Sequence, residues 1–457
     1  MLDGAFLERM KLLLGDGYED FSAALEKSAE RSFRINPIKA DPSDFILPAG
    51  IEIEEIPYAS GAYTVISGGE GLGNTPMHHA GQIYIQDGGA MSAVCALPKL
   101  PSNAKIADLC AAPGGKSSQL AALIGEDGAL LSNEIIHKRA VILVENLTRM
   151  GIKNAIVTSA DTKKLRALYP DFFDAVTVDA PCSGEGMFRK GEIAISEWSE
   201  ENVRLCAERQ TEILKNASGM VKPGGYLLYS TCTYSLEENE MQIDRFLKDN
   251  PSFSLMKIEN EALIKHTADG IQFDGAFSND LSYCRRFYPH LASGEGQFFA
   301  LMKNNGDATG EKPTSDKASL PTKEEERIAR EFLKENLSEL PKGRILKRGG
   351  NLEIVAHGIP IDPSITVTGG VTLGEIRGKM LFPHHHFFSA YGRDFIRQEE
   401  LYDDDSVERY LRGEEIEQRT KGSGYIAVSY KGSTLGGGKA SSGRIKNHYP
   451  KFLRKKG

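Results

Sequence analysis

Short apolar runs alternate with helix-forming stretches through the middle of the chain. The apolar runs have the length of buried strands and lie at 105–109, 129–133, 155–158, 175–178, 226–229 and 298–302. Between them, apolar residues recur with helical spacing at 115–124, 137–150 and 202–220. Strands that alternate with helices in this way are typical of a parallel sheet with helices on both faces. The pattern therefore predicts an α/β fold with a doubly wound sheet.

The pattern on either side of this region predicts further units. Residues 1–78 combine two helical patterns with an extended stretch at 31–39, which indicates a small α+β unit. After the sheet region, 79–303, the polar stretch 304–323 is typical of a linker. Beyond it we expect an intermediate domain at 324–390 and a β-rich domain with a Gly-rich loop at 391–457.

The charge of the chain is distributed unevenly. Of the 457 residues, 55 are Lys or Arg and 63 are Asp or Glu, which gives a net charge of −8. Nine basic residues and no acidic residue fall within 421–457, so the rest of the chain is strongly acidic. A basic end on an acidic body suggests a polyanionic partner that binds at that end. A solvated tail that keeps the protein in solution explains the charge equally well.

Cysteine use and hydropathy exclude several classes of protein. The 6 cysteines lie far apart and form no C-x-x-C pair, which excludes a disulfide scaffold and a Cys-rich zinc module. No apolar run reaches the ~18 residues of a membrane span, and the N-terminus lacks the apolar core of a signal peptide. We therefore expect a cytoplasmic protein with no membrane association. His384, His385 and His386 have no accompanying acidic or Cys ligands, so we expect no metal.

The first turn of the predicted sheet has the features of a ligand-binding loop. The strand KIADL, with Asp108 near its end, runs into CAAPGGKSSQLA. In this loop Gly114 and Gly115 permit a tight turn and a close approach to a ligand. Neither the G-x-G-x-x-G fingerprint nor the P-loop spacing is present. The loop is therefore suited to an adenosine-type cofactor that carries no phosphates.

Acidic residues follow the next strands of the predicted sheet. Glu134 lies 20 residues after Gly114, where an acidic residue binds ribose hydroxyls in folds of this kind. Asp161 follows the third strand, where it can accept a hydrogen bond from an adenine amino group, and Asp179 ends the fourth. Helix capping is the alternative explanation for any one of these residues. A ribose and an adenine without phosphates predict S-adenosylmethionine as the cofactor.

Two cysteines follow the fourth and fifth strands and are expected to meet at the same edge of the sheet. Cys182 lies in DAPCSGEG, and Cys232 lies in STCTYS. A buried cysteine is usually an inert small hydrophobe, but both of these stand in polar loops, where reactive thiols are found. A thiolate that adds to C6 of a pyrimidine makes C5 nucleophilic enough to take a methyl group. A protonated Asp179 can assist that addition by donating a hydrogen bond to N3 of the ring.

The segments DLCAAPGGKSSQLA, DAPCSG and TCTYS resemble the signature segments of RNA (cytosine-C5) methyltransferases of the Sun/Nop type. The resemblance covers most of residues 1–303 and implies a Rossmann-like class I S-adenosylmethionine methyltransferase domain. It implies that Cys232 is the nucleophile and that Cys182 helps to release the product. The residues that it implies for binding of the methyl donor are Cys110, Ala111, Ala112, Pro113, Gly114, Gly115, Lys116, Glu134, Asp161 and Asp179.

One segment departs from the family pattern. Residues 296–299 read Gly-Gln-Phe-Phe and follow Glu295, whereas members of the family usually have Asp-Gly-Phe-Phe. We expect this departure to affect local packing and not the chemistry.

The C-terminal segments FPHHHFF, GGGK and IKNHYPKFLR resemble the C-terminal extension of RsmF/YebU-type bacterial small-subunit rRNA methyltransferases. That extension resembles a PUA-type RNA-binding module, so the resemblance implies 16S rRNA or the small ribosomal subunit as the partner. The residues that we expect to bind RNA are Arg34, Lys439, Arg444, Lys446, Tyr449, Lys451 and Arg454. The alternatives are a tRNA cytosine-C5 methyltransferase and an RNA-binding assembly factor with a vestigial methyl-transfer site. The expected oligomeric state is a monomer.

Overall fold

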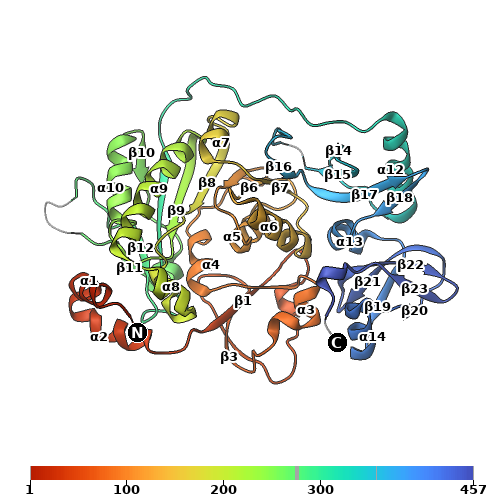
Figure 1. The fold of residues 1–457 in the computed structure, drawn as a ribbon, viewed down its shortest axis with the longest axis horizontal. Helices are drawn as coiled ribbons and strands as arrows, with labels where there is room; N and C mark the ends of the chain where they lie inside the picture. The colour runs from red at the N-terminus through yellow and green to blue at the C-terminus, as the bar shows by residue number, and fades with distance from the viewer. Residues whose placement is uncertain (1, 273–276, 357, 456–457) are drawn as a thin grey trace.

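The N-terminal part of the chain forms a small antiparallel sheet (Figure 1). The computed structural model describes residues 2–272, 277–356 and 358–455. Helices α1 (Gly4–Leu14) and α2 (Tyr18–Leu25) come first, and the strand order is β2-β3-β1-β4. These strands are β1 (Arg31–Ile35), β2 (Glu52–Glu55), β3 (Ala62–Ser67) and β4 (Ile83–Ile85), and α3 (Pro76–His79) lies before β4. The predicted α+β unit is confirmed.

A ten-stranded sheet forms the centre of the molecule, in the order β11-β12-β13-β9-β8-β5-β6-β7-β16, with β10 beside β13. Its parallel strands are β5 (Lys105–Asp108), β6 (Ala129–Asn133), β7 (Ala155–Thr158), β8 (Phe173–Asp179) and β9 (Val221–Thr231). The antiparallel part contains β10 (Phe253–Leu255), β11 (Ala268–Asp269), β12 (Arg285–Phe287) and β13 (Gln297–Asn304). The predicted doubly wound sheet is confirmed, although the run at 298–302 pairs antiparallel with its neighbour.

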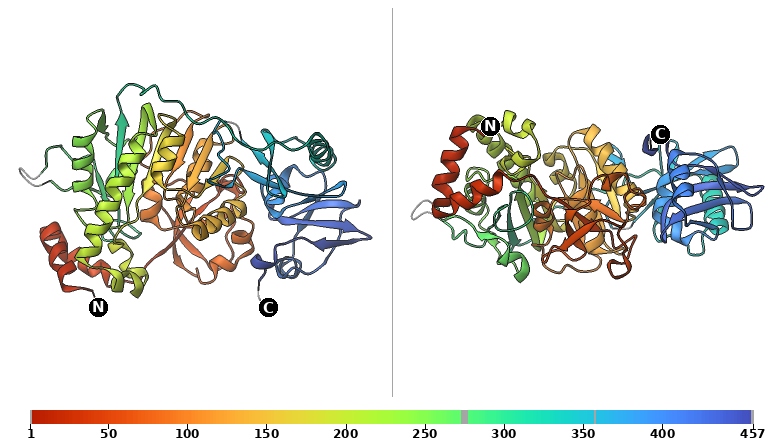
Figure 2. Two further views of the ribbon diagram at one scale, coloured as in Figure 1. Left: turned by 45° about the horizontal axis from the view of Figure 1, so that its top comes forward. Right: turned by 90° about the horizontal axis from the view of Figure 1, so that it is seen from below.

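Helices cover both faces of this sheet (Figure 2). One buried cluster includes residues of α5 and α6, and another includes residues of α7, α9 and α10. The helices of this region are α4 (Gly88–Val94), α5 (Gly115–Ile124), α6 (His137–Arg149), α7 (Thr162–Leu168), α8 (Glu192–Glu197), α9 (Glu200–Ser218), α10 (Glu240–Asp249) and α11 (Glu261–Lys265). Strand β5 lies at the centre of the parallel part, with β6 and then β7 on one side and β8 and then β9 on the other. Ligands of such sheets bind outside the carboxyl ends of the strands, where the strand order reverses.

The predicted linker runs along the surface of the central body without regular structure (Figure 1). It is held by backbone hydrogen bonds, from Thr314 N to Leu168 O at 2.8 Å and from Lys317 N to Ile361 O at 2.9 Å. The segment therefore lies against the protein and is not a free tether.

A four-stranded sheet follows the linker, but its domain also contributes to the central sheet. Helices α12 (Lys323–Asn336) and α13 (His385–Tyr391) accompany the strands β14 (Arg344–Arg348), β15 (Asn351–Val355), β17 (Val371–Arg377) and β18 (Met380–Pro383). Strand β16 (Thr366–Thr368) leaves this unit and pairs antiparallel with β7. It covers an edge strand that would otherwise present unpaired backbone groups. The expected domain at 324–390 therefore shares a core with the central sheet, and Ile361 and Ile365 belong to that core.

The basic C-terminal segment is part of a folded sheet and not a tail. The last sheet has the order β19-β21-β22-β23-β20, and α14 (Asp404–Arg412) packs with it. Its strands are β19 (Gln398–Leu401), β20 (Ile416–Glu417), β21 (Gly424–Tyr430), β22 (Ser433–Ser441) and β23 (Arg444–Asn447). Since β21, β22 and β23 all lie within 421–457, the solvated-tail alternative is wrong. None of the helices in the described part of the chain is both long and apolar enough to span a bilayer.

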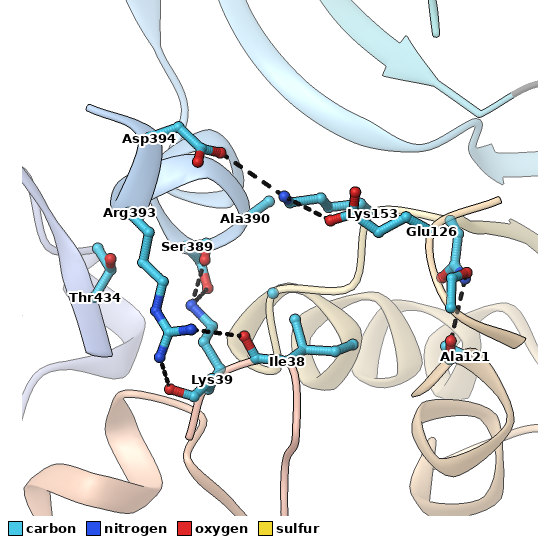
Figure 3. A pocket seen from close by; sticks show the side chains of 13 residues that line it. Ile38, Lys39, Ala121, Glu126, Lys153, Ser389, Ala390, Arg393, Asp394 and Thr434 are labelled. Carbon is cyan, nitrogen blue, oxygen red and sulfur yellow. Dashed lines mark hydrogen bonds and ion pairs between the residues drawn. The ribbon is translucent and has the colours of Figure 1, made fainter. Parts of the chain in front are cut away.

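The C-terminal half is docked on the rest of the molecule around a cavity of about 300 Å³ (Figure 3). Lys39 of the N-terminal unit donates to the carbonyl of Ser389, and Arg393 donates to the carbonyl of Lys39. Lys153 forms an ion pair with Glu126 at 3.0 Å. Burial lowers the pKa of Lys39 to about 7. Because backbone carbonyls accept from Lys39 and Arg393, we interpret this junction as a docking contact.

Candidate active site

The loop after β5 forms one wall of a cavity at the point where the strand order reverses. Gly114 has φ = +116°, a conformation that favours glycine, and it turns the chain from the strand into α5. The cavity has a volume of about 310 Å³. Of the residues expected to bind the methyl donor, those that line it are Cys110, Ala111, Ala112, Pro113, Gly115, Lys116 and Asp179.

The polar groups at this loop fit a nucleoside-type cofactor. Asp108 is buried directly behind the loop, and its Oδ2 accepts from Ser117 Oγ at 2.6 Å. Its Oδ1 has no donor in the part of the chain that the structure describes, so a ligand that brings a donor is accommodated. Burial raises the pKa of Asp108 to about 6. The residues present therefore fit S-adenosylmethionine, which would rest on the 110–116 loop.

Two other expected donor-binding residues do not line this cavity. Glu134 directly follows β6 at the same edge of the sheet, where it accepts from the backbone N–H of Ile136 at 3.0 Å and pairs with Arg139 at 3.3 Å. Asp161 is exposed and accepts from Lys164 N at 2.8 Å as the N-cap of α7. The capping explanation therefore accounts for the contact that Asp161 makes, and a role of either residue in donor binding stays a prediction.

The two cysteines meet beside the cavity. Cys182 follows β8, Cys232 follows β9, and their sulfur atoms lie 3.2 Å apart. This distance is much longer than the ~2.05 Å of a disulfide, so both are free thiols. Cys232 lines the cavity, and its carbonyl accepts from the backbone N–H of Gly186 at 2.9 Å. A Cβ at Gly186 would lie 2.6 Å from the carbonyl oxygen of Gly296, so the glycine permits the close approach of these loops.

The contact with Cys232 and burial affect the acidity of Cys182. The hydrogen bond to Cys232, followed by burial, raises the pKa of Cys182 well above its ordinary value. The Cys182 thiol lies within hydrogen-bond distance of the Cys232 sulfur. The nearby Cys110 is also neutral, because burial raises its pKa strongly. Of the two paired cysteines, only Cys232 is among the described residues that line the cavity, which favours it as the nucleophile.

Two buried glutamates that the sequence analysis missed hold the cysteine loops together. Glu238 accepts from Ser183 N at 3.0 Å, and Ser183 Oγ lies 2.9 Å from Thr233 Oγ1. Glu185 accepts from Thr233 Oγ1 and from Tyr234 N, each at 2.9 Å. The run EENE shortly after the second cysteine was the available signal, but acidic residues at that spacing are equally typical of a helix start.

Glu238 gives the stability of the protein a specific dependence on pH. Burial raises the pKa of Glu238 to about 7, from an ordinary value near 4.5. Between these values the folded state keeps a proton that the unfolded state loses, so the contribution of Glu238 to stability falls as the pH rises and is constant above about 7. Glu238→Gln removes this titration. We expect the stability of the variant relative to wild type to increase by about 3 kcal/mol between pH 4 and 8.

Calorimetric unfolding of both proteins across this pH range measures the effect. A constant offset between the two proteins would reflect only the altered hydrogen bonds. A difference that does not grow with pH contradicts the shifted titration of Glu238.

Asp179 is held by three donors at the cavity wall. Lys116 Nζ donates to Oδ2 at 2.9 Å, while Ser230 Oγ and Gln297 Nε2 donate to Oδ1 at 2.8 and 3.3 Å. Burial would lower the pKa of Lys116, but the adjacent Asp179 outweighs burial and raises it. The expectation of a protonated Asp179 assumed a neighbouring carboxylate, whereas the neighbour in contact is a lysine. Asp179 is therefore arranged as an acceptor.

Two of the residues expected to bind RNA are buried inside the protein. Arg34 donates to Gln86 Oε1 at 2.9 Å and to the carbonyl of Gly115 at 3.0 Å, so it supports the cofactor loop. Tyr449 is 2% exposed, and its hydroxyl lies 2.8 Å from His79 Nδ1. Neither is available to RNA, and both predictions are wrong.

The other expected RNA-binding residues lie at the surface. Arg454 is half-buried and donates to the carbonyl of Tyr449 at 3.2 Å, which indicates a structural contact. The side chains that are exposed are Lys439, Arg444, Lys446 and Lys451. Within the described part of the chain, no group of three or more His, Cys, Asp or Glu is placed to hold a metal.

Three family models match successive parts of the chain. The model of 16S rRNA methyltransferase RsmB/F matches residues 96–303, and that of the N-terminal domain of 16S rRNA methyltransferase RsmF matches residues 2–88. The model of the methyltransferase RsmF PUA domain matches residues 402–455. Together with the sheet and the cofactor loop, these matches define the class: the protein is an S-adenosylmethionine-dependent methyltransferase.

Full-length relatives narrow this class. Ribosomal RNA small subunit methyltransferase F of Escherichia coli O6:H1 is 30% identical over 98% of this chain and 96% of its own length. The protein of the same name from Aeromonas hydrophila is 30% identical, over 95% and 93%. The chain belongs to the RsmF family of ribosomal RNA small subunit methyltransferases.

Solved structures share the fold of the first two thirds of the chain. A methyltransferase homolog protein from Pyrococcus horikoshii is 28% identical with a TM-score of 0.58, over 66% of this chain and 95% of its own. NSun6 from the same organism, solved with SFG, is 20% identical with a TM-score of 0.52, over 67% and 99%, and shows the fold alone.

Proposed function

We propose that this enzyme transfers a methyl group to C5 of cytosine in 16S rRNA through a covalent bond between Cys232 and the base. The observation that carries the proposal is the 3.2 Å approach of the Cys182 and Cys232 sulfur atoms beside the cofactor loop. The names of the full-length relatives support the small-subunit RNA as the substrate. A tRNA substrate has no comparable support.

Different residues at the cavity act in successive steps of the proposed methyl transfer. S-adenosylmethionine, when bound, supplies an electrophilic methyl group. The Cys232 thiolate forms a bond to C6 of the cytosine, which makes C5 nucleophilic. After methylation a base removes the proton from C5, and the bond from Cys232 to C6 breaks. The Cys182 thiol lies within hydrogen-bond distance of the departing sulfur and stabilises it as a thiolate.

Lys116 and Asp179 orient the base in this proposal. Both line the cavity with Cys232, and Lys116 holds the Asp179 carboxylate at 2.9 Å. A carboxylate fixed in this way can accept a hydrogen bond from the 4-amino group of cytosine, which is attached next to the methylated C5. The lysine limits the movement of the carboxylate before the base enters.

A methyl-transfer assay tests the proposed function. Small subunits and stripped 16S rRNA from cells that lack this protein are incubated with the enzyme and methyl-labelled S-adenosylmethionine. We expect label in 5-methylcytidine, at positions that bisulfite mapping of the same RNA identifies. Label in tRNA instead of 16S rRNA, or in another nucleoside, contradicts the proposal.

The last sheet provides a surface for the phosphates of the RNA. Lys439 on β22 and Arg444 and Lys446 on β23 are exposed neighbours, because Lys439 and Lys446 pair in register. Each lysine or arginine that contacts a phosphate releases counterions, so it steepens the dependence of affinity on salt. We place the enzyme in the cytoplasm, because its proposed substrate is part of the ribosome.

Charge removal on this surface is expected to weaken RNA binding without affecting the methyl donor. Deleting residues 421–457 would destroy the last sheet, so the test uses Lys439→Ala, Arg444→Ala and Lys446→Ala together. We expect the slope of log affinity against log salt to fall by about 2–3. Filter binding between 50 and 300 mM salt measures it. Lys312→Ala, Lys334→Ala and Lys342→Ala, which are exposed elsewhere, form the control. Equal slopes for the two triple variants contradict this surface.

A further inference from the structure

Gln297 lies at the start of β13, inside the segment that departs from the family pattern. Its side chain is 3% exposed and lines the cavity together with Cys232 and Asp179. The departure from the family pattern therefore reaches the wall of the cavity that holds Cys232. We propose that Gln297 is a specificity-determining residue that accepts a hydrogen bond from the 4-amino group of the target cytosine. This inference rests on the proposed function.

The contact with Asp179 fixes which end of the Gln297 amide faces a ligand. Nε2 lies 3.3 Å from Asp179 Oδ1, where only the amide nitrogen, and not the oxygen, is a donor. Ser230 Oγ donates to the same carboxylate oxygen at 2.8 Å, and Lys116 occupies the other. The carbonyl oxygen of Gln297 is thus the end left for a ligand in the cavity that this residue lines.

Two acceptors side by side match the edge of cytosine. The 4-amino group carries two N–H donors, which the Asp179 carboxylate and the Gln297 carbonyl can share. Uracil has a carbonyl oxygen at this position, and that oxygen would face two acceptors without a donor between them. A site built to hydrogen-bond a group discriminates strongly against a ligand that lacks it. Gln297 therefore favours cytosine over uracil at the same position in the RNA.

The packing around Gln297 keeps the amide in place. Gln297 pairs with Phe287 in the β12–β13 ladder, and its neighbour Phe298 is fully buried. Gly296 precedes it, and a Cβ there would lie 2.4 Å from the ring of Tyr234. The backbone at this point cannot shift without disturbing the core, so the amide is presented to the base in a fixed position.

A double-mutant cycle between protein and base tests the proposal. The probes are two fragments of 16S rRNA in which the methylated cytidine is replaced by 5-fluorocytidine or by 5-fluoropyrimidin-2-one riboside. The second base lacks the 4-amino group, and fluorine at C5 prevents release, so both probes form lasting adducts. Single-turnover rates of adduct formation are measured on denaturing gels for wild type and Gln297→Met.

We expect loss of the amino group to slow wild type about tenfold more than it slows Gln297→Met. Gln242→Met is the matched control, because Gln242 is similarly buried on α10 and does not line the cavity. It should show the wild-type ratio. Gln297→Asn, which keeps an amide, provides a second variant if Gln297→Met does not fold, and it should lose part of the discrimination.

The outcomes separate this inference from the proposed function. Equal ratios for wild type and the Gln297 variants overturn the role of Gln297 and leave the covalent mechanism intact. If wild type forms no adduct with the 5-fluorocytidine RNA, the proposed function itself fails.

Discussion

Replacing Cys232 by alanine is expected to abolish methyl transfer and every covalent adduct with RNA. Among the described residues, Cys110 and Cys232 carry the only thiols that line the cavity, and burial raises the pKa of Cys110 strongly. Without Cys232 no bond to C6 forms, and C5 of cytosine is too weak a nucleophile to react unaided. We expect turnover to fall at least ~10⁴-fold. Labelled S-adenosylmethionine and RNA, analysed by filter assay and denaturing gel, measure both effects.

Binding measurements distinguish a chemical defect from a structural one. Cys206→Ala is the matched control, because Cys206 is a buried thiol on α9 that does not line the cavity. Cys232→Ala should bind S-adenosylmethionine and RNA as wild type does. Residual methylation above about a thousandth of the wild-type rate would assign the nucleophile to another residue.

Replacing Cys182 by alanine is expected to have the opposite effect on the adduct. The Cys182 sulfur lies 3.2 Å from the Cys232 sulfur, so removing the Cys182 thiol leaves the departing thiolate without this hydrogen-bond partner. Attack at C6 remains possible, because Cys232 and the cofactor loop are unchanged. We expect turnover to fall by about 10²–10⁴ while a protein–RNA adduct accumulates and survives denaturing gels.

The double variant Cys182→Ala/Cys232→Ala provides the control, because it should form no adduct. An adduct in the Cys232 variant and none in the Cys182 variant would exchange the two roles. Rapid turnover of Cys182→Ala would show that the thiol is not needed for release.

The sequence predicted the centre of this molecule better than its periphery. The alternation of apolar runs with helical stretches located the parallel strands along the chain. In a parallel sheet the loops after β8 and β9 open on the same edge, so Cys182 and Cys232 could be expected to meet. Strand β16 could not be foreseen. It has three residues, and its partner β7 lies about 200 positions earlier in the chain. Nothing local in the sequence indicates such a pairing.

The burial of individual side chains was the second feature that the sequence could not predict. Arg34 and Tyr449 have the chemistry of RNA-binding residues, but packing against Gln86 and His79 removes them from solvent. Composition gives the charge and the aromatic character of a residue, whereas the fold decides which of these groups stay at the surface. Lys439, in contrast, stays exposed because the last four residues of β22 alternate between buried and exposed positions.

Strand β16 also determines how the enzyme can choose among the cytosines of a large RNA. A domain on a free tether of 20 residues would wander over a root-mean-square range of about 25 Å. Here a piece of the C-terminal half is hydrogen-bonded into the sheet that carries Cys232, and the junction at Lys39 adds further contacts. These contacts fix the distance between the last sheet and Cys232. If the last sheet binds the folded RNA as proposed, we expect only a cytosine at the matching distance from that contact to reach the Cys232 sulfur.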